Sequence, residues 1–315
     1  MTAMSAQGRF WAVALGAGAL SGAMYCAVTF RPFAGMPLFY IAQLPLFAAG
    51  LSHGAAASAV AGLAATALVA MRSFELALFV AGGFLLPAAV LTRQALLSRR
   101  SADGTLEWYP PGLLTGWLVG LGLAGLAVAG LMLAGSHGGV ESYARQVAAW
   151  SADMLAQIVQ QPMSAAERAR AVDNMSAQLV GLCIALLMVV TAANGVLAQG
   201  IMMRFGLNRR PAPDMAALDL SPYVPALLAG ALLLGWLLPG DLGYLARNAV
   251  PVILVGGLLG GLAVAHAAVR RSEGKRWMLV VVYLVAGMGL PMFVLVSLGL
   301  AEPFLNLKRR MLRAA

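Results

Sequence analysis

An unbroken apolar stretch, Leu182-Cys183-Ile184-Ala185-Leu186-Leu187-Met188-Val189-Val190, lies inside a longer run without formal charge, Asn174 to Met203. Its residues do not alternate between apolar and polar, which excludes a strand of a transmembrane β-barrel. A helix rises about 1.5 Å per residue, so about 20 residues cross a hydrocarbon core of about 30 Å. The stretch therefore predicts a transmembrane helix.

Runs of this kind recur through the chain and are separated by short charged junctions. Hydrophobic residues make up 61% of the 315 residues and charged residues 10%, whereas a soluble domain carries about 25% charged residues. This composition excludes a water-soluble fold. We predict an all-α, polytopic transmembrane bundle of eight to nine spans that forms a single membrane domain. The predicted spans lie near residues 10–30, 36–50, 53–70, 74–92, 112–134, 177–203, 221–239, 248–268 and 277–300.

The second uncharged run, Pro32 to Met71, is too long for one span and must turn back on itself. Pro37, Pro45 and the sequence Gly50-Leu51-Ser52-His53-Gly54 are the natural breaks, because proline removes a helical hydrogen bond and glycine relaxes the backbone. Residues 36–50 would reach only about 22 Å as a helix. We expect this segment to be short or re-entrant, so the span count is eight or nine.

Most basic residues gather in three junctions, and two predicted spans separate each junction from the next. All three therefore lie on one side, which the excess of Lys and Arg identifies as the cytoplasmic side of a bacterial inner membrane. The lipid bilayer is then the first partner of the protein. The three clusters are Arg93, Arg99 and Arg100; Arg204, Arg209 and Arg210; and Arg270, Arg271, Lys275 and Arg276.

The C-terminal tail conflicts with this orientation. It carries Lys308, Arg309, Arg310 and Arg313, yet it lies one predicted span beyond the third basic cluster. Either the tail is an exception to the charge rule, or the sequence Met288-Gly289-Leu290-Pro291 breaks the last span and turns the chain back.

Residues 135–176 form a predicted extracytoplasmic loop with both acidic and basic side chains. Within it, Val140 to Ile158 places apolar residues at helical spacing. We expect a helix there that either lies on the membrane surface or caps the bundle, and we favour capping because the face is weakly basic. The apolar face comprises Val147, Trp150, Met154, Leu155 and Ile158.

Two series of glycines recur at every fourth residue, where they form a flat stripe on a helix. Such stripes let helix backbones approach closely, which drives helix association in lipid. We expect these glycines to pack within the chain in preference to forming a dimer. They are Gly112, Gly116 and Gly120 in one span and Gly256 and Gly260 in another.

Few polar side chains lie inside the predicted spans, and such groups are functional candidates because their burial in lipid is costly. The candidates for the polar lining of a pocket are His53, Asn194, Gln199 and His266. The alternative for each of them is a structural hydrogen bond between helices. Gln43 is a further polar group at membrane depth.

The sequence carries no enzymatic or metal-binding signature. Gly274-Lys275 lacks the earlier glycine and the following Ser or Thr of a phosphate-binding loop, and no His-Glu-x-x-His occurs. Cys26 and Cys183 both lie in apolar spans, so we expect neither a disulfide nor a zinc site. The net charge of +9 comes from residues that flank spans rather than from a nucleic-acid-binding surface. We therefore expect no enzyme, cofactor, metal or nucleic-acid partner.

Five passages spread over most of the chain carry a resemblance to a known family. They are Leu44-Pro45-Leu46; Gly50-Leu51-Ser52-His53-Gly54; Glu107-Trp108-Tyr109-Pro110-Pro111-Gly112; Gly261-Leu262-Ala263-Val264-Ala265-His266-Ala267; and Gly299-Leu300-Ala301-Glu302-Pro303-Phe304-Leu305-Asn306-Leu307-Lys308-Arg309-Arg310. On these passages the chain resembles the YybS-like bacterial membrane proteins, a family of unknown function.

That family is thought to be distantly related to the S components of energy-coupling-factor vitamin transporters. These are helical bundles, typically of six spans, that hold a small ligand and dock on a membrane scaffold with paired ATPases. The resemblance implies that the chain binds or transports a small solute without its own ATPase, together with other membrane subunits. No vitamin-binding motif matches residue by residue, so the resemblance assigns no ligand contact. The alternative is a non-transporting membrane scaffold or assembly protein.

Overall fold

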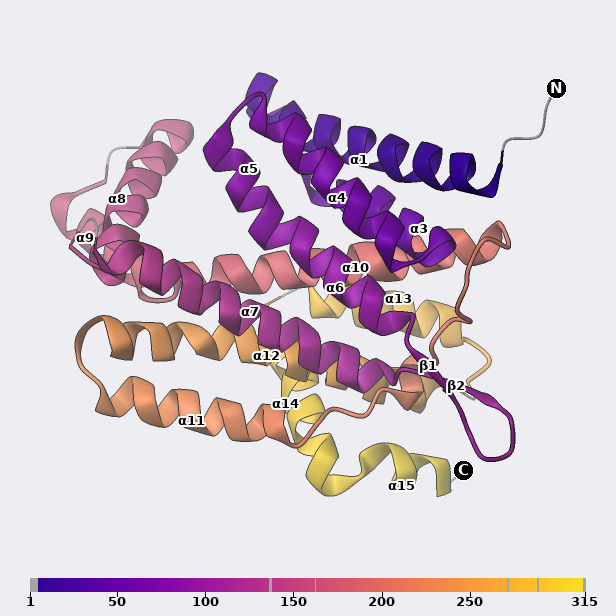
Figure 1. Ribbon diagram of the computed structural model, residues 1–315. Coiled ribbons are helices and arrows are strands. Elements are labelled where there is room, and N and C mark those ends of the chain that lie inside the picture. The colour runs from indigo at the N-terminus through magenta and orange to yellow at the C-terminus, as the bar shows by residue number, and fades with distance from the viewer. Residues whose placement is uncertain (1–4, 136–137, 162, 271, 288, 314–315) are drawn as a thin grey trace. The chain divides into compact units, whose positions relative to one another are not determined.

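The computed structural model describes residues 5–135, 138–161, 163–270, 272–287 and 289–313, and the chain folds into two compact units. Unit 1 comprises Met1–Leu118 and Val189–Leu218, and unit 2 comprises Val119–Met188 and Asp219–Ala315. Two long helices, α7 (Pro111–Ala134) and α10 (Leu179–Arg204), contribute residues to both units (Figure 1).

Helices make up almost all of both units. Unit 1 contains α1 (Ala6–Phe30), α2 (Pro32–Ile41), α3 (Leu44–His53), α4 (Ala55–Ala70), α5 (Phe74–Val80), the π-helical turn η1 (Ala81–Leu85), α6 (Leu86–Ala95), the strands β1 (Ser98–Arg100) and β2 (Leu106–Trp108), and the 3-10 turn η2 (Met215–Ala217). Unit 2 contains α8 (Val140–Val159), α9 (Ala165–Ala177), α11 (Tyr223–Leu237), α12 (Gly240–Val269), α13 (Lys275–Ala286), α14 (Leu290–Leu305) and α15 (Leu307–Arg313).

The predicted helical membrane bundle is confirmed in its coarse form. Within the described residues, six helices or continuous helix pairs are long and apolar enough to cross a membrane. They are Ala6–Phe30, Pro32–His53, Phe74–Ala95, Pro111–Ala134, Leu179–Arg204 and Gly240–Val269. Three shorter apolar helices, Ala55–Ala70, Tyr223–Leu237 and Pro291–Leu305, accompany them. The protein is therefore a multi-pass membrane protein, although the predicted count of eight to nine spans is not established.

The segment that we expected to be short or re-entrant, residues 36–50, belongs to a longer helical stretch. α2 and α3 follow one another with only a turn between them, and together they are 22 residues long. At about 1.5 Å per residue this stretch reaches about 33 Å, which is enough to cross a bilayer. The proline at residue 45 interrupts the helix without shortening the segment.

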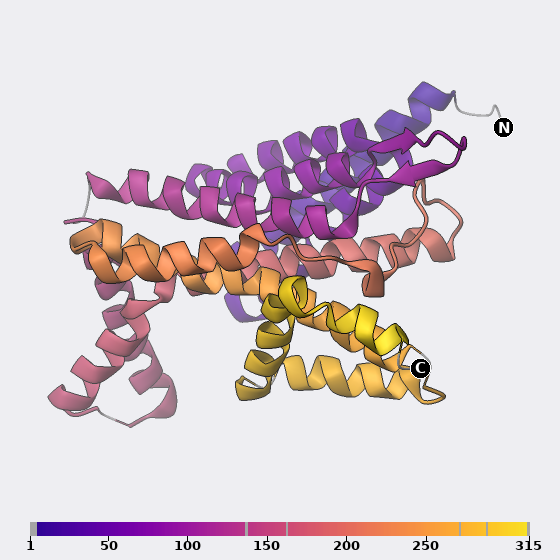
Figure 2. The same cartoon turned by 90° about the horizontal axis from the view of Figure 1, so that it is seen from below.

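The last predicted span, residues 277–300, is two helices rather than one. α13 and α14 are separated at Gly287 and Gly289, and Gly289 has a positive φ of 74° that suits glycine. The helices are 12 and 16 residues long, about 18 and 24 Å, so neither reaches across a full bilayer. α15 then runs back toward the end of α12 that carries the third basic cluster (Figure 2). Arg271 and the predicted break residue Met288 lie outside the described residues.

Two of the basic clusters meet at one end of unit 1. The guanidinium of Arg210 donates from Nη1 to the carbonyl oxygen of Ala95 at 2.9 Å and from Nη2 to that of Tyr109 at 2.8 Å. These two residues flank the short antiparallel hairpin β1–β2, which the sequence did not predict and in which Arg99 pairs with Glu107. Burial lowers the pKa of the Arg210 guanidinium. The clusters around Arg93 and Arg204 therefore share one end, as the charge pattern predicts.

α1 packs along α4 through glycines that leave no room for a side chain. A Cβ added to Gly18 would lie 2.5 Å from the carbonyl oxygen of Ala61 and 2.7 Å from the Cβ of Ala64. A Cβ added to Gly22 would lie 2.7 Å from a methyl carbon of Leu68. Gly18 has no room for a larger residue because the backbone of α4 is in the way, whereas at Gly22 the Leu68 side chain would have to move.

Replacement of Gly18 by leucine should push α1 away from α4. We expect the variant to lose about 1–3 kcal/mol of stability through overpacking, seen as a lower thermal midpoint in detergent. Gly16→Leu is the matched control, because a Cβ at Gly16 meets nothing within 4 Å. Equal midpoints for the two variants would show that α1 does not pack on α4 in this way.

Candidate functional site

The continuous stretch formed by α2 and α3 is interrupted half-way along its length. α2 ends at Ile41, Ala42 and Gln43 form a turn, and α3 begins at Leu44. Pro45 explains the interruption, because it has no N–H to donate to the carbonyl of Ile41 and its ring clashes with that carbonyl. Ten residues lie on each side, about 15 Å of helix, so the turn sits near the middle of a bilayer of about 30 Å.

Three buried side chains bind the backbone around this turn. Ser21 Oγ of α1 donates to the carbonyl of Ala42 at 2.7 Å, and Asn194 Nδ2 of α10 donates to that of Tyr40 at 2.8 Å. Gln43 Nε2 donates to the carbonyl of Phe84 at 2.7 Å. The first two bonds supply partners to carbonyl groups at the break between α2 and α3, which lipid cannot do, and the third ties the turn to another helix.

The carbonyl that Gln43 binds belongs to a second irregular helix. Phe84 lies in the π-helical turn η1, which joins α5 to α6. Pro87 follows it and cannot donate to the preceding turn, so the regular α-helical ladder is interrupted here as well. Short π-helical turns inside α-helices occur frequently at functional sites. Two helix irregularities thus face one another through the Gln43 side chain.

Three buried polar atoms at this place have no hydrogen-bond partner among the described residues. They are Gln43 Oε1, Asn194 Oδ1 and the Tyr25 hydroxyl. The amide orientations follow from the contacts, because the backbone carbonyls only accept and must therefore meet the amide nitrogens. Leaving a buried polar atom unpaired costs about 1–3 kcal/mol. We name this group of residues the interrupted centre: Ser21, Tyr25, Tyr40, Ala42, Gln43, Phe84 and Asn194.

The interrupted centre is electrically neutral and bordered by aromatic rings. The Tyr25 ring packs 5.2 Å from that of Phe39 and 5.4 Å from that of Phe84, measured between ring centres. Its unpaired groups are two amide oxygens, which only accept hydrogen bonds, and one hydroxyl, which donates and accepts. A solute that offers N–H or O–H groups would satisfy them.

Two further unpaired hydroxyls, one on α4 and one on α6, lie beside the second half of α3. Ser58 Oγ and Thr92 Oγ1 are buried and have no hydrogen-bond partner among the described residues. Both side chains lie against Gly50, whose added Cβ would stand 2.8 Å from the Cβ of Ser58 and 3.3 Å from that of Thr92. Gly50 follows Gln43 by seven residues, about 10 Å of helix toward the basic end. Unpaired polar atoms thus occur at two levels along α3.

The residues predicted from the sequence fall at separate places in unit 1. Asn194 belongs to the interrupted centre, whereas Gln199 donates from Nε2 to the carbonyl of Arg210 at 2.8 Å. His53 ends α3 at the basic end, where its Nδ1 lies 2.9 Å from Ser52 Oγ. Arg209 donates from Nε to the carbonyl of Ser52 at 3.1 Å. The three unit 1 candidates therefore contact three different groups.

His266 lies in unit 2 and contacts α13. Its Nε2 is 3.1 Å from the Tyr283 hydroxyl, and the two rings meet edge to face at 6.0 Å. No group of three or more His, Cys, Asp or Glu side chains within the described residues is arranged to hold a metal ion.

The two predicted glycine stripes behave differently. A Cβ at Gly256 would lie 3.0 Å from a methyl carbon of Val119, and one at Gly260 would lie 3.2 Å from the Cα of Gly299. α12 therefore packs closely on α14. A Cβ at Gly116 or Gly120 meets nothing within 4 Å. The predicted packing role of these two glycines therefore has no close contact behind it among the described residues.

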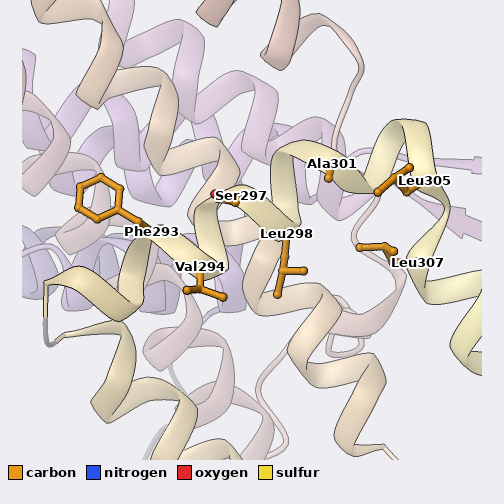
Figure 3. Close-up of a pocket in the computed structure, with 7 residues that line it drawn as sticks. All are labelled: Phe293, Val294, Ser297, Leu298, Ala301, Leu305 and Leu307. Carbon is orange, nitrogen blue, oxygen red and sulfur yellow. The ribbon is translucent and has the colours of Figure 1, made fainter.

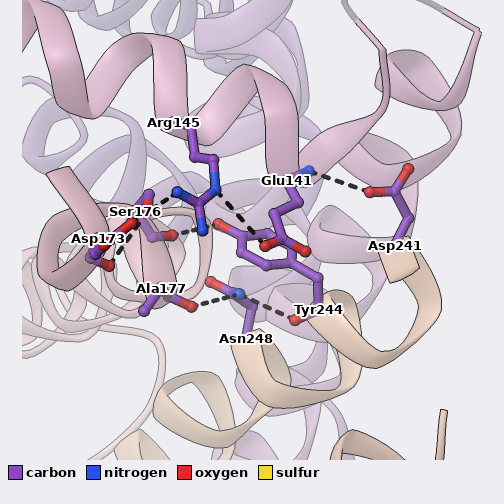
Figure 4. Close-up of polar contacts among 8 residues, drawn as sticks. All are labelled: Glu141, Arg145, Asp173, Ser176, Ala177, Asp241, Tyr244 and Asn248. Carbon is purple, nitrogen blue, oxygen red and sulfur yellow. Dashed lines mark hydrogen bonds and ion pairs between the residues drawn. The ribbon is translucent and has the colours of Figure 1, made fainter. Parts of the chain in front are cut away.

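A second buried polar network lies in unit 2, where α9 ends and α10 begins (Figure 4). The Tyr244 hydroxyl donates to the carbonyl of Ser176 at 2.7 Å. Asn248 donates from Nδ2 to the carbonyl of Ala177 at 3.1 Å and accepts the N–H of Gly181 at 2.8 Å. These side chains pair the backbone groups that the helix junction exposes. The network satisfies its members and has the character of a structural joint.

Sequence reasoning missed Ser21, Tyr25, Tyr244 and Asn248. Ser21 and Tyr25 are ordinary residues of an apolar span, and nothing local indicates that a broken helix lies beside them. Asn248 sits at the predicted start of a span, where a polar residue is unremarked. The one available signal was Gln43 two residues before Pro45, which combines a polar group with a helix break.

An apolar groove lies on the outer side of α14 and the start of α15 (Figure 3). It has a volume of about 510 Å³, and Ser297 is the single polar residue in its lining. The side chains of Phe293 and Val294 are exposed there. The other lining residues are Leu298, Ala301, Leu305 and Leu307. Such a surface suits lipid tails, and only the Ser297 hydroxyl offers a directional contact to a polar solute.

Two tyrosine variants separate the interrupted centre from the structural joint. Tyr25→Phe removes a hydroxyl without a described partner, so stability should stay unchanged or rise by up to about 1 kcal/mol. Tyr244→Phe removes one of the two hydrogen bonds that the Ser176 carbonyl accepts, the other coming from the N–H of Gln178, and should cost about 0.5–1.5 kcal/mol. Thermal unfolding in detergent compares the two. A larger loss for Tyr25→Phe than for Tyr244→Phe would contradict the assignment.

Comparison with known proteins gives one match. A family model described as a predicted membrane protein (DUF2232) matches residues 19–301, which is most of the chain. No curated protein and no solved structure matches. The matched region contains the whole interrupted centre.

Proposed function

The chain belongs to the DUF2232 family of predicted membrane proteins, and from this premise we propose that it binds and carries a small polar solute. The solute contacts the interrupted centre of unit 1. The chain has no ATPase of its own and depends on other membrane subunits for energy. Its membrane is the bacterial inner membrane, and it is not an enzyme.

The observation that carries this proposal is the set of unpaired acceptors at the helix interruption. Transporters commonly bind substrates near the middle of the bilayer, where discontinuous helices free polar backbone and side-chain groups. Gln43 and Asn194 are at most 3% exposed, yet each keeps one amide oxygen without a described partner. A purely structural joint gains nothing from such atoms, as the fully paired contacts of Asn248 illustrate.

The chemistry of the interrupted centre defines the class of solute. The contacting groups are neutral, so the solute is uncharged or weakly cationic and presents hydrogen-bond donors. The rings of Tyr25, Phe39 and Phe84 favour a solute with an apolar or planar face. The unpaired hydroxyls of Ser58 and Thr92 offer further contacts toward the basic end.

We also propose the YybS-like relationship and, through it, kinship with S components. Among the described residues, six helices or helix pairs are long enough to cross a membrane, the number typical of S components. The chain resembles them further in lacking a phosphate-binding loop. Shorter helices such as α4 and α11 are additions to that pattern.

Native mass spectrometry of protein purified in gentle detergents tests solute binding. We expect the wild-type chain to retain a small molecule and Tyr25→Phe to retain it with roughly two- to tenfold lower affinity, the effect of one hydrogen bond. Tyr244→Phe is the control and should retain it fully. The proposal fails if no detergent preserves a bound molecule, or if both variants bind equally.

The orientation of the chain can be measured independently. Reporter fusions after Arg100, Arg210, Arg276 and Arg313 should all report the cytoplasm, because α13 and α14 return the tail to the end of the third cluster. A single long span after Arg276 would instead place the fusion at Arg313 on the opposite side. That result would contradict the break at Gly287 and Gly289.

A membrane scaffold or assembly protein is the second candidate function. It is favoured by Gly116 and Gly120, which present a small-residue stripe on α7 that no described residue covers within 4 Å of an added Cβ. Under this alternative another membrane helix packs there. The mass spectrum would then show a copurifying subunit that Gly120→Leu removes, and no retained small molecule.

A further inference from the structure

The hairpin formed by α8 and α9 is only partly covered by the rest of unit 2. One stripe of α8 is buried along the first part of the helix, where Val140 and Ala144 pack with Tyr244 of α12. Ala148 and Ala152 continue this buried stripe. The covered residues of α8 are therefore Val140 in its first turn and the alanines that follow along the same stripe.

The end of α8 exposes large apolar side chains. Leu155, Ile158 and Val159 are 47%, 61% and 53% exposed, and Trp150 is 63% exposed. Ile158 follows Val140 by 18 residues, about five turns of 3.6 residues, so both lie on the same side of the helix. The apolar stripe of α8 is thus buried at the start of the helix and exposed at its end. Leu155 and Ile158, which belong to the face that we predicted to cap the bundle, thus lie beyond the part of α8 that packs on α12, and Trp150 is exposed as well.

The hairpin runs across the long helices of its unit rather than along them. In Figure 2, α8 and α9 extend sideways from the end of α11 and α12. Asp241, in the first turn of α12, accepts the N–H of Glu141 at 3.1 Å, which ties the start of α8 to that end. A helix that crosses membrane spans at their ends lies parallel to the membrane surface.

The charges of the hairpin are paired between its own helices. Arg168 donates to Asp153 at 2.7 Å, and Arg145 donates to Asp173 at 2.7 Å. The hydrogen bond from Arg168 lowers the pKa of the Asp153 carboxyl. Asp153 follows Val140 by 13 residues, which places it about 140° around α8 from Val140 and Ile158 and about 160° from Leu155, whereas Trp150 lies between the two sides. The helix is therefore amphipathic, with its polar side held by α9.

We propose that the second half of α8 inserts its apolar stripe into the boundary between lipid headgroups and acyl chains of the bilayer that the spans cross. Trp150 suits this level, because its ring is apolar and its N–H is polar. We choose the bilayer as the partner of this stripe because of its position. The stripe lies at the level where the spans end, and it extends sideways beyond them. The hairpin then anchors the junction of α9 and α10 that Tyr244 and Asn248 hold.

Site-specific fluorescence tests this proposal on the full chain in lipid nanodiscs. In a background with Cys26→Ala and Cys183→Ala, Ile158→Cys is labelled with a nitrobenzoxadiazole dye. Gln157→Cys is the matched control, because Gln157 is exposed and lies about 100° around the helix from Ile158. Each label is then exposed to lipids carrying a spin-label quencher at acyl carbon 5 or 12, or to iodide in the water.

At Ile158 we expect blue-shifted emission that the carbon-5 quencher reduces at least twofold more than the carbon-12 quencher, with little effect of iodide. At Gln157 we expect quenching by iodide. Quenching of the Ile158 label by iodide instead would place the stripe in water and overturn the proposal. Protection from both lipid and iodide quenchers would mean that a second chain covers the stripe, which also overturns it. Because both positions are exposed, labelling should leave the elution volume of the protein unchanged.

Discussion

A backbone carbonyl inside a bilayer has no water to bind, and this constraint shapes unit 1 around the interruption between α2 and α3. Pro45 breaks the helical ladder, so the carbonyls before it need new donors. Ser21 of α1 and Asn194 of α10 supply these donors. Gln43, in the turn itself, donates to a carbonyl of the π-helical turn η1. Three helices are thereby fixed to one point near the middle of the membrane.

The two units use buried polar groups in different ways. In unit 2, Asn248 pairs both ends of its amide, and the Tyr244 hydroxyl has a carbonyl partner. In unit 1, the amides of Gln43 and Asn194 each use one end and keep the other unpaired among the described residues. Full pairing stabilises a joint, whereas an unpaired acceptor is a cost that a bound solute can remove. This contrast is the physical basis for assigning solute binding to unit 1.

Small residues set how closely two helices can pack. Gly18 and Gly22 bring α1 onto α4, and Gly260 meets Gly299 where α12 crosses α14. Gly116 has the same spacing and the same chemistry, yet among the described residues no atom lies within 4 Å of a Cβ added to it. The presence of a glycine stripe therefore permits close packing without specifying the partner. Whether a stripe is filled depends on the paths of other helices.

The sequence alone determined that the chain is helical and crosses a membrane many times, because a long uncharged run has no other stable solution in lipid. It also placed the clusters around Arg93 and Arg204 at one end, since topology follows local charge. The break at residue 45 could also be predicted from the sequence, because a proline interrupts the helix in which it lies.

The tertiary structure alone decided what these local features become. It showed that residues 36–50 extend into a full-length stretch, that residues 277–300 divide into two helices, and that Ser21, Gln43 and Asn194 meet. The side chains that donate to the free carbonyls of a broken helix come from spans distant in sequence. Their positions in space, and not a sequence motif, determine which residues do this. Hydrophobicity and charge act along the chain and can be read from it. Hydrogen bonds between helices depend on which faces meet, and only the packed structure sets that.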